Sequence, residues 1–312
     1  MIYNDLNFIF REFLLYKKLI KKNLCYLPFF NNWITKRSIN IHKKKLGFIE
    51  QKLINSGLNL VSPKDFNYVN PSDYSHCNIW GSGYSAAESS LNQKLSSDSF
   101  DIGFGYSYLL NKDFNFYFIE NAAPGFSELV NYQKKGLKKM VNLKSCKLIF
   151  KNIWQEKNDI NYAINEYKNL ALFSKDIVIP HYLSNKRIYM NAVDYILEKD
   201  DIFFRQACST IVFSIAFAKY LGFKKIVIHG VDFGGKYFFD LPEYEHVSEF
   251  KPNFKNSEIY NEKWRKSSSR HPSGNCLELF LPLIKEKLNF LNIDLYSASR
   301  NSPLKNILPL YE

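Results

Sequence analysis

Several signatures of familiar protein classes are missing from this chain of 312 residues. Its five cysteines are scattered and form no Cys-x-x-Cys pair, so a disulfide framework and a zinc site are both unexpected and a reducing compartment fits. No apolar run reaches about 18 residues, which argues against a transmembrane helix. Charge interrupts the early apolar runs, so we expect no cleavable signal peptide.

The sequence also lacks internal repeats, low-complexity tracts and any Asp-x-Asp motif. A divalent metal held by protein oxygens generally needs carboxylates that lie close together. We therefore expect neither a metal nor a resident cofactor.

Positive charge is abundant but uneven. The net charge is +12, and residues 1–50 hold ten Lys and Arg against three acidic residues. Large aromatic side chains lie among these basic residues, including Phe8, Phe13, Tyr16 and Trp33. This combination suits an anionic membrane surface or a nucleic acid, and it also suits a packed helix with a solvated lysine face.

The order of elements predicts an α/β fold. Apolar content of 46% supports a sizeable core. We expect a helical extension over residues 1–70 and a domain over 71–312, in which strands alternate with helices as in a Rossmann-like, mostly parallel sheet. Strands are predicted over 76–80, 101–104, 114–120, 145–150, 176–180, 225–230 and 293–296. Helices are predicted over 86–95, 127–136, 159–170, 186–198, 209–221 and 275–291. The polar stretch 240–274 has the character of a lid.

The segment around Gly81 carries the first candidate site. A predicted strand over 76–80 leads directly into Gly81, Ser82 and Gly83, followed by Ser85 and a helix. Backbone N–H groups at such a turn, together with the helix dipole, suit a phosphate, and glycine lets a ligand approach closely. The third glycine of a dinucleotide fingerprint is absent. A tight strand-to-helix turn without a ligand is the alternative.

Two further segments precede and follow the predicted helix over 209–221. Arg205 and Gln206 lead to Ser209 and Thr210, which suit a helix N-cap or an anion site in which Arg205 adds a charge-assisted contact. After the helix, a buried strand ends at Asp232, whose carboxylate is able to bind a hydroxyl.

Residues after Asp232 add candidates for phosphate binding and proton transfer. Tyr237 and Lys236 suit contact with a leaving phosphate, although Tyr237 also reads as an ordinary packed aromatic. His271 lies in the polar loop and is a candidate general base, whereas His229 lies within an apolar strand and is expected in the core. Asn301 and Ser302 follow the last strand, where they either close the pocket or form a plain turn.

These segments, in this order, resemble the bacterial sialyltransferases of glycosyltransferase family 42, typified by the Campylobacter lipooligosaccharide enzymes. The resemblance covers about residues 76–312. It implies a metal-independent GT-A-like variant of the Rossmann fold in which the Gly81–Ser85 loop cradles the CMP part of CMP-sialic acid. The match assigns further donor contacts to Asn121, Ser209, Thr210, Asp232, Asn301 and Ser302.

The resemblance also assigns the catalytic roles and shows where this chain departs from the family. His271 matches the general base in the lid, and Tyr237 matches one of two tyrosines that stabilise the departing phosphate. The second tyrosine is Gly234 in this chain. The family arginine before the carboxylate-binding motif is Ala207, for which Arg205 is a substitute two residues away. These changes leave the donor open to a related nonulosonic acid.

The resemblance thus implies inverting transfer of a nonulosonic acid from CMP to a hydroxyl of a cell-surface glycan, without nucleic acid as a partner. We expect a cytoplasmic enzyme that its basic, aromatic N-terminus holds peripherally at the inner face of a bacterial inner membrane, and the resemblance permits a homo-oligomer. Two alternatives stay open. One is a pyrophosphokinase-like relative that binds ATP or GTP with Mg²⁺, and the other is a non-catalytic, basic nucleic-acid-binding protein.

Overall fold

A computed structural model describes the central sheet and much of its surroundings. The described residues are 63–92, 98–110, 112–120, 146–151, 171–173, 177–178, 193–197, 205–206, 209–234, 236–250 and 277–312, with 33, 51, 54–57, 135–136 and 190. Within these ranges, no helix has both the length and the apolar character needed to cross a membrane.

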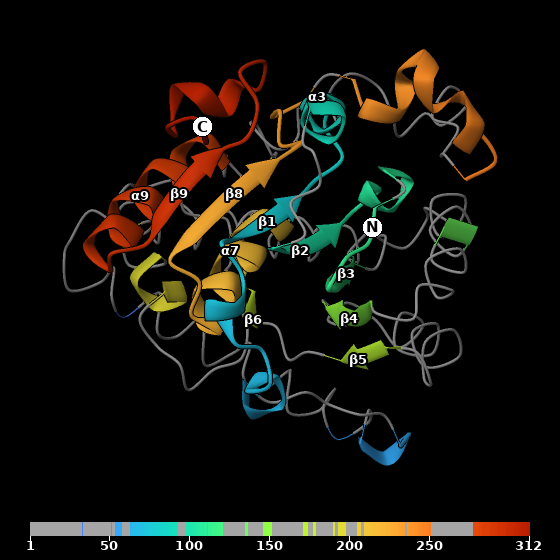
Figure 1. Ribbon diagram of the computed structural model, residues 1–312. Coiled ribbons are helices and arrows are strands. Elements are labelled where there is room, and N and C mark those ends of the chain that lie inside the picture. The colour runs from blue at the N-terminus through green and yellow to red at the C-terminus, as the bar shows by residue number, and fades with distance from the viewer. Residues whose placement is uncertain are drawn as a thin grey trace, which may run out of the picture.

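Seven parallel strands form the central sheet in the order β5-β4-β3-β2-β1-β8-β9 (Figure 1). Their bounds are β1 His76–Trp80, β2 Ser99–Phe104, β3 Phe116–Glu120, β4 Lys147–Lys151, β5 Ala171–Phe173, β8 Lys225–His229 and β9 Asp294–Ser297. A second sheet pairs β6 (Ile177–Val178) with β7 (Arg205–Gln206). The predicted Rossmann-like parallel sheet is therefore confirmed.

The strand order reverses between β1 and β8. On one side of β1 lie β2, β3, β4 and β5, in the order in which they follow along the chain. On its other side lie β8 and β9. In open parallel sheets, ligands bind beyond the carboxyl ends of the strands at such a reversal. The loops that follow β1 and β8 are thus the first place to look for a site.

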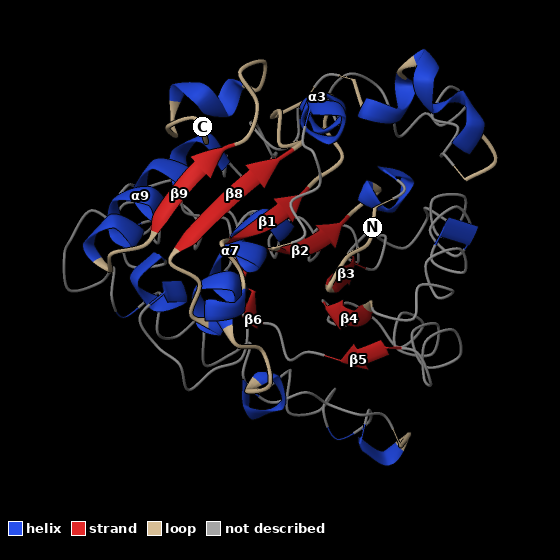
Figure 2. Ribbon diagram, in the orientation of Figure 1, coloured by secondary structure: helices blue, strands red, loops and turns tan. Residues whose placement is uncertain are grey.

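Helices cover both faces of this sheet (Figure 2). Among the described residues, the main α-helices are α3 Ser85–Asn92, α7 Thr210–Leu221 and α9 Leu277–Phe290. Short 3-10 helices are η1 Pro63–Phe66, η2 Pro71–Asp73, η3 Ser107–Leu110, η4 Phe238–Asp240, η5 Pro242–Val247 and η8 Pro303–Asn306. Helix α7 ends at Gly222, whose positive φ of 96° suits a glycine C-cap, and β8 begins three residues later.

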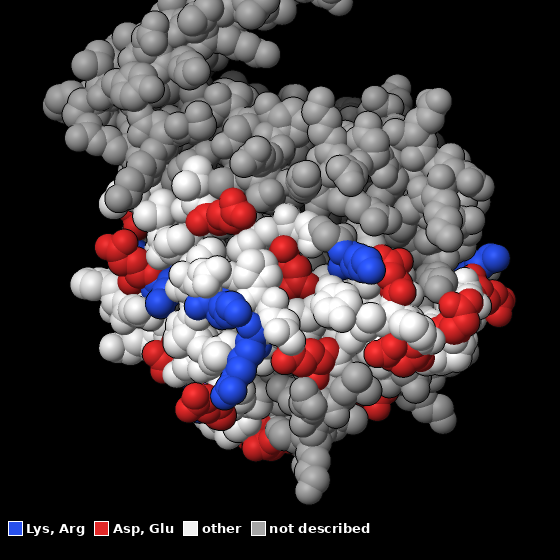
Figure 3. Space-filling model, turned by 90° about the horizontal axis from the view of Figure 1, so that it is seen from above, with Lys and Arg blue, Asp and Glu red and all other residues white. Residues whose placement is uncertain are grey.

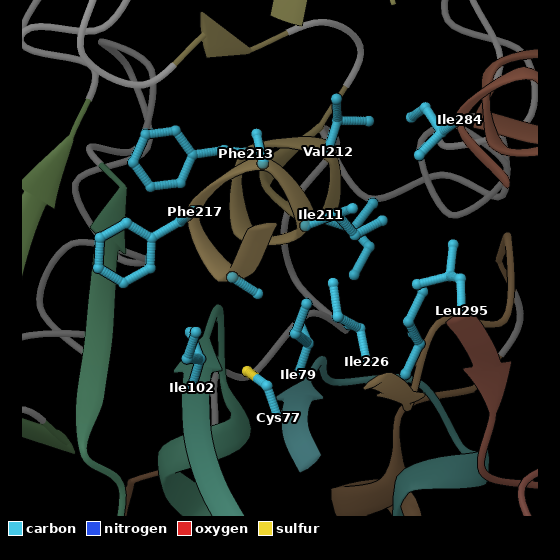
Figure 4. Close-up of a cluster of buried hydrophobic side chains, with 14 of the residues drawn as sticks. Cys77, Ile79, Ile102, Ile211, Val212, Phe213, Phe217, Ile226, Ile284 and Leu295 are labelled. Carbon is cyan, nitrogen blue, oxygen red and sulfur yellow. The ribbon is translucent and has the colours of Figure 1, made fainter. Parts of the chain in front are cut away.

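One face of the sheet packs against α7 and α9. Figure 4 shows Phe213 and Phe217 of α7 above the strands, with Ile79 and Ile226 pointing toward them. Side chains alternate between the two faces along a strand, so every second residue of β1 and β8 points toward α7, and these residues include Ile79 and Ile226. The apolar residues of α7 surround it almost completely, which fits a helix buried on several sides.

The opposite face holds a smaller core beneath α3, η3, η4 and η5. Ala86 and Ala87 of α3 pack with Trp80 there, together with Tyr244 and Val247 of η5. The first part of the predicted lid is therefore anchored to the domain by buried side chains. Residues 251–274 of that lid lie outside the described residues.

Several element predictions are confirmed and others are wrong. β1 has the predicted bounds, and β8, β9, α7 and α9 agree within two residues at each end. Of the strand predicted over 176–180, the structure describes residues 177–178, which form β6 in the small second sheet. β5 and β7 were not predicted, because runs of three and two residues carry too little periodicity. Most of the predicted helices over 127–136 and 159–170, and of the 1–70 extension, lies outside the described residues.

Candidate functional site

The loop after β1 is fastened to the loop after β8. The N–H of Gly81 donates to the carbonyl of His229 at 2.8 Å, and the N–H of Gly83 donates to the carbonyl of Gly230 at 2.8 Å. These bonds continue the parallel pairing of β1 with β8 beyond the strand ends. The two loops therefore form one surface at the reversal of strand order.

Both glycines are required by this crossing. A Cβ on Gly81 would lie 2.5 Å from the Gly230 carbonyl oxygen, and one on Gly83 would lie 2.5 Å from Oδ2 of Asp232. Gly230 itself has a φ of +63°, a region that favours glycine. The sequence suggested that these glycines admit a ligand, whereas the structure shows that they admit the β8 loop.

Asp232 closes the N-terminus of α3. Its Oδ2 accepts from the Ser85 N–H at 2.7 Å, and its Oδ1 accepts from the Ser85 hydroxyl at 2.5 Å. The carboxylate thereby satisfies the N–H of Ser85, one of the backbone donors that we predicted to bind a phosphate. Asp232 stays partly exposed, and a partly exposed carboxylate favours sugar hydroxyls over a second anion as its neighbours.

Aromatic side chains form one wall beside the glycine loop. Tyr237 pairs its backbone with Gly83, and its ring stacks on Phe239 with centroids 4.8 Å apart. The ring of Tyr106 meets that of Tyr237 edge to face at 6.1 Å, and the Tyr106 N–H donates to the Ser82 hydroxyl at 2.7 Å. Tyr237 therefore lies against the predicted loop.

Sequence reasoning missed Tyr106. It follows β2 and belongs to no motif, so only the pairing of β1 with β2 brings it to Ser82. The sequence offered only Gly105 before it, which marks a turn at a strand end; the structure gives this glycine a φ of +67° and a close approach to the Ser82 hydroxyl. The Tyr106 ring is partly exposed, which makes it available to a ligand at this edge.

The turn after β9 joins the same edge. The Ser302 hydroxyl donates to the Val231 carbonyl at 3.1 Å and also caps η8 by accepting from the Leu304 N–H. Ser299 donates to the carboxylate of Glu88 on α3. Ser302 is thus a buried structural link to the β8 loop, while Asn301 is exposed and is the member of the pair that faces solvent.

The start of α7 points toward this carboxyl edge. Phe217, near the end of α7, contacts Phe116 at the beginning of β3, whereas Phe213, one turn earlier, contacts Phe118 further along that strand. Ser209 is the N-cap of α7 but makes no side-chain capping bond, and its hydroxyl oxygen is buried without a hydrogen-bond partner among the residues that the structure describes. Thr210 is buried as well. Arg205 and Gln206 form β7, directly before this helix.

Two of the predicted site residues are not placed. His271 and Asn121 lie outside the described residues, so their roles remain predictions from the sequence. The structure brings together Gly81, Ser82, Gly83, Ser85, Asp232, Tyr237 and Ser302. Ser209 and Thr210 lie at the same edge of the sheet.

Comparison with solved structures identifies similar chain traces. The chain is similar to the monofunctional alpha-2,3-sialyltransferase Cst-I from Campylobacter jejuni, with 16% identity, a TM-score of 0.45, and coverage of 80% of this chain and 82% of that one. It is also similar to the sialyltransferase CstII from Campylobacter jejuni in complex with the substrate analogue CMP-3FNeuAc, with 20% identity, a TM-score of 0.45, and coverage of 76% and 86%. No protein-family model and no curated protein matches the chain.

The described surface around the site is not strongly basic. Figure 3 views the molecule from above, and its described part shows acidic side chains over much of the face with few basic ones between them. Exposed acidic residues of η4, η5 and the turn that follows include Asp240, Glu243, Glu245 and Glu249. No cluster of three or more His, Cys, Asp or Glu that suits a metal occurs among the described residues.

His229, beneath the β8 loop, is expected to make stability depend on pH. Burial, and secondarily the charges of Lys112 and His76, hold the pKa of His229 well below its ordinary value of 6.5. Its Nδ1 is buried without a partner among the described residues, so protonation would leave an N–H unpaired. Between 6.5 and the lower folded-state pKa, the unfolded chain binds more protons, and the free energy of unfolding falls as the pH falls.

This contribution is measurable by urea unfolding. From about pH 7.5 to about pH 5.5, His229 alone should lower the free energy of unfolding by about 1.4 kcal/mol. The variant His229→Gln lacks this titration, while every other group still titrates in both proteins. An equal pH dependence for the variant and the unmodified chain would contradict the assignment.

Proposed function

We propose that this chain is an inverting glycosyltransferase that moves sialic acid, or a related nonulosonic acid, from a CMP donor to a hydroxyl of a glycan. The glycan is proposed to be a cell-surface lipooligosaccharide or lipopolysaccharide of a bacterium. The crossing of the β1 and β8 loops at the reversal of strand order carries this proposal, because it gathers the residues of the family motifs at one edge.

The crossing suits a mononucleotide sugar. The glycine loop lies against the β8 loop rather than opening wide, which limits the room for a dinucleotide. Asp232 offers carboxylate oxygens to ribose hydroxyls beside Ser85, and Tyr106 and Tyr237 supply an aromatic wall. Pockets for such ligands combine apolar walls with a few polar groups that fix orientation.

The proposed reaction is a single displacement at the anomeric carbon. The acceptor oxygen forms the new bond to this carbon as the bond to the CMP phosphate oxygen breaks, and that electron pair leaves on CMP. His271 takes the proton of the acceptor hydroxyl as general base. The phosphate of CMP is already a stable leaving group, so the step requires no metal.

Charge that develops on the departing phosphate needs a nearby donor. Tyr237 lies beside Gly83 with its ring held by Phe239, and a held phenol is a preorganised donor for developing negative charge. Lys236 precedes it in the chain and is exposed, so its ammonium group is free to swing toward the phosphate. Tyr237 is therefore the proposed phosphate contact, with Lys236 in support.

The carboxylate of the donor sugar fits the start of α7. The Ser209 hydroxyl is buried and has no hydrogen-bond partner in the described part of the chain, and a helix N-terminus favours an anion. Thr210 and Arg205 complete the proposed subsite from the same segment. A nonulosonic acid differs from most sugars in having this carboxylate, so the subsite favours that donor class.

Thermal stability with added nucleotides tests the proposal. CMP should raise the melting temperature, because a ligand that binds the folded state alone stabilises it. ATP with Mg²⁺ stabilising the chain in place of CMP would instead favour a pyrophosphokinase-like activity, and stabilisation by a duplex oligonucleotide would favour a nucleic-acid-binding protein. Hydrolysis of a panel of CMP-nonulosonates then identifies the sugar without any acceptor.

The basic and aromatic segment 1–50 is proposed to hold the enzyme at the inner face of the membrane, where lipid-linked acceptors lie. Deletion of residues 1–50 should reduce binding to vesicles that contain anionic lipid by at least about tenfold, since each basic residue near such a surface contributes about 1 kcal/mol. Co-sedimentation measures this, with zwitterionic vesicles as the lipid control. Unchanged binding after the deletion would refute the proposal.

A matched variant separates charge from aromatic insertion. Replacing Lys17, Lys18, Lys21 and Lys22 with glutamine keeps the aromatic residues and removes four charges. Loss of binding comparable to that of the deletion would assign the attachment to charge, and such attachment should weaken as salt rises.

A further inference from the structure

The side chain of His229 is buried at the carboxyl end of β8, immediately before the loop that contacts Gly81 and Gly83. Its ring stacks on the indole of Trp80, with centroids 3.8 Å apart and an interplanar angle of 13°. Its Nε2 lies 2.9 Å from Oδ1 of Asn78 on β1. Both contacts reach from β8 to β1, so His229 ties together the two strands that flank the proposed site.

A chain of buried polar groups extends from this contact into the sheet. Asn78 Nδ2 donates to Asp101 Oδ1 at 3.1 Å, and Trp80 Nε1 donates to the same oxygen at 2.6 Å. Lys112 pairs with Asp101 at 3.2 Å, with both side chains about nine-tenths buried. Every member of this chain lies on the face of the sheet that α3 covers.

The chain also determines which nitrogen of His229 carries the proton. An ionised carboxylate only accepts hydrogen bonds, so the amide of Asn78 must direct its nitrogen to Asp101 and its oxygen to His229. The Nε2 of neutral His229 is therefore the donor to Asn78. Asp101, held by Lys112, thus fixes the orientation of two further side chains.

The backbone of His229 belongs to the site itself. Its carbonyl receives the N–H of Gly81, and the next carbonyl, that of Gly230, receives the N–H of Gly83. A side chain that is fixed by stacking and by a hydrogen bond holds its own peptide group in one orientation. Asp232 follows two residues beyond Gly230 and reaches Ser85 from there.

We propose that His229 is a positioning residue for the nucleotide loop: its ring, clamped by Trp80 and Asn78, sets the carbonyls that align Gly81 and Gly83. The inference rests on the proposed function for its ligand but not for its geometry. An apolar residue at 229 would fill this position without a polar partner. A buried network in which Nε2 of His229, Asn78, Asp101 and the indole of Trp80 are joined by hydrogen bonds instead selects a single arrangement of these groups.

Three variants separate positioning from bulk stability. His229→Phe keeps an aromatic ring on Trp80 and removes the donor to Asn78. His229→Gln keeps a donor in place of Nε2 and removes the ring. Ile226→Ala creates a cavity on the same strand but on the opposite face of the sheet, so it lowers stability without touching the network.

The first measurement is CMP affinity by calorimetry, at a temperature well below the melting point of every variant. We expect His229→Phe to weaken CMP binding about tenfold, His229→Gln to restore it to within about threefold, and Ile226→Ala to leave it unchanged. Asn78→Ala removes the oxygen that accepts from Nε2 of His229, so it should weaken CMP binding as much as His229→Phe does. If His229→Phe fails to fold, Asn78→Ala decides the question.

The second measurement needs no ligand. The chain has 13 glycines, so selective ¹⁵N-glycine labelling gives a simple spectrum in which amide exchange of Gly81 and Gly83 is followed directly. Exchange of both amides should rise at least about tenfold in His229→Phe and stay slow in Ile226→Ala, because the carbonyls that receive them are displaced only in the former.

The outcomes distinguish the inference from the function. Wild-type-like CMP affinity and glycine protection in His229→Phe would overturn the positioning role, as would equal losses in Ile226→Ala. Absence of CMP binding by the unmodified chain would overturn the proposed function, while glycine exchange would still decide the role of His229.

Discussion

Replacing His271 with alanine should lower transfer of the sugar to its acceptor by at least about a hundredfold, the lower end of general-base effects. The imidazole is assigned to the proton of the acceptor hydroxyl, so its loss should reduce kcat far more than it reduces affinity for CMP. The measurement is the rate of product formation with saturating donor and acceptor. Affinity for CMP, measured in parallel by calorimetry, should stay within about threefold.

A second histidine in the same polar region provides the control. His246 on η5 is exposed, and its Nδ1 lies 2.9 Å from the Glu243 carbonyl. His246→Ala removes an imidazole without touching the glycine loop, so its activity should match that of the unmodified chain. Turnover of His271→Ala at the unmodified rate would end the assignment of His271 as base.

Gly83→Ala should weaken CMP binding by about thirtyfold. A Cβ at this position lies 2.5 Å from Asp232 Oδ2 and 2.9 Å from the Gly230 carbonyl oxygen, so the two loops must shift apart to admit it. Without ligand, the variant relieves the clash by moving the two loops apart. A ligand that contacts both loops must bring them back together, and the free energy of the clash is then lost from binding. Overpacking of this kind costs about 2 kcal/mol, which corresponds to roughly thirtyfold in affinity.

Gly222→Ala is the matched control for that variant. Gly222 has a φ of +96° and ends α7 at the opposite edge of the sheet, so an alanine there strains the backbone away from the site. We expect both variants to melt at lower temperature and only Gly83→Ala to lose CMP affinity. Equal CMP affinities in the two variants would show that the crossing of the loops does not shape the nucleotide site.

The long strands were predictable because burial leaves a clear mark on them. β1 and β8 are runs of five residues with apolar side chains at alternate positions on the α7 face, and their bounds could be predicted within one residue. β5 has three residues and β7 has two, which is too short for any pattern. Short length explains why β5 and β7 were missed, whereas the equally short β6 was found because it lies within the predicted strand over 176–180.

The site was predictable as a list of residues but not as a set of contacts. The sequence indicated Gly81, Gly83 and Asp232 as ligand-binding candidates. It gave no sign that Asp232 caps α3, since Ser85 lies 147 residues away in the chain. Tyr106 was missed for the same reason, because its relation to Ser82 and Tyr237 exists only after three strand ends meet.

The direct pairing of β1 with β8 has a consequence for how the protein is made. The chain between β1 and β8 runs from Trp80 to Lys225, and closing so long a loop is slow in folding compared with forming local contacts. The carboxyl edge beside β1 is therefore complete only after β8 has paired with it. During synthesis, the edge that is proposed to bind the nucleotide is incomplete until residues beyond 232 have been translated. A ligand that binds there joins early and late parts of the chain, and so it protects the sheet as a whole from unfolding.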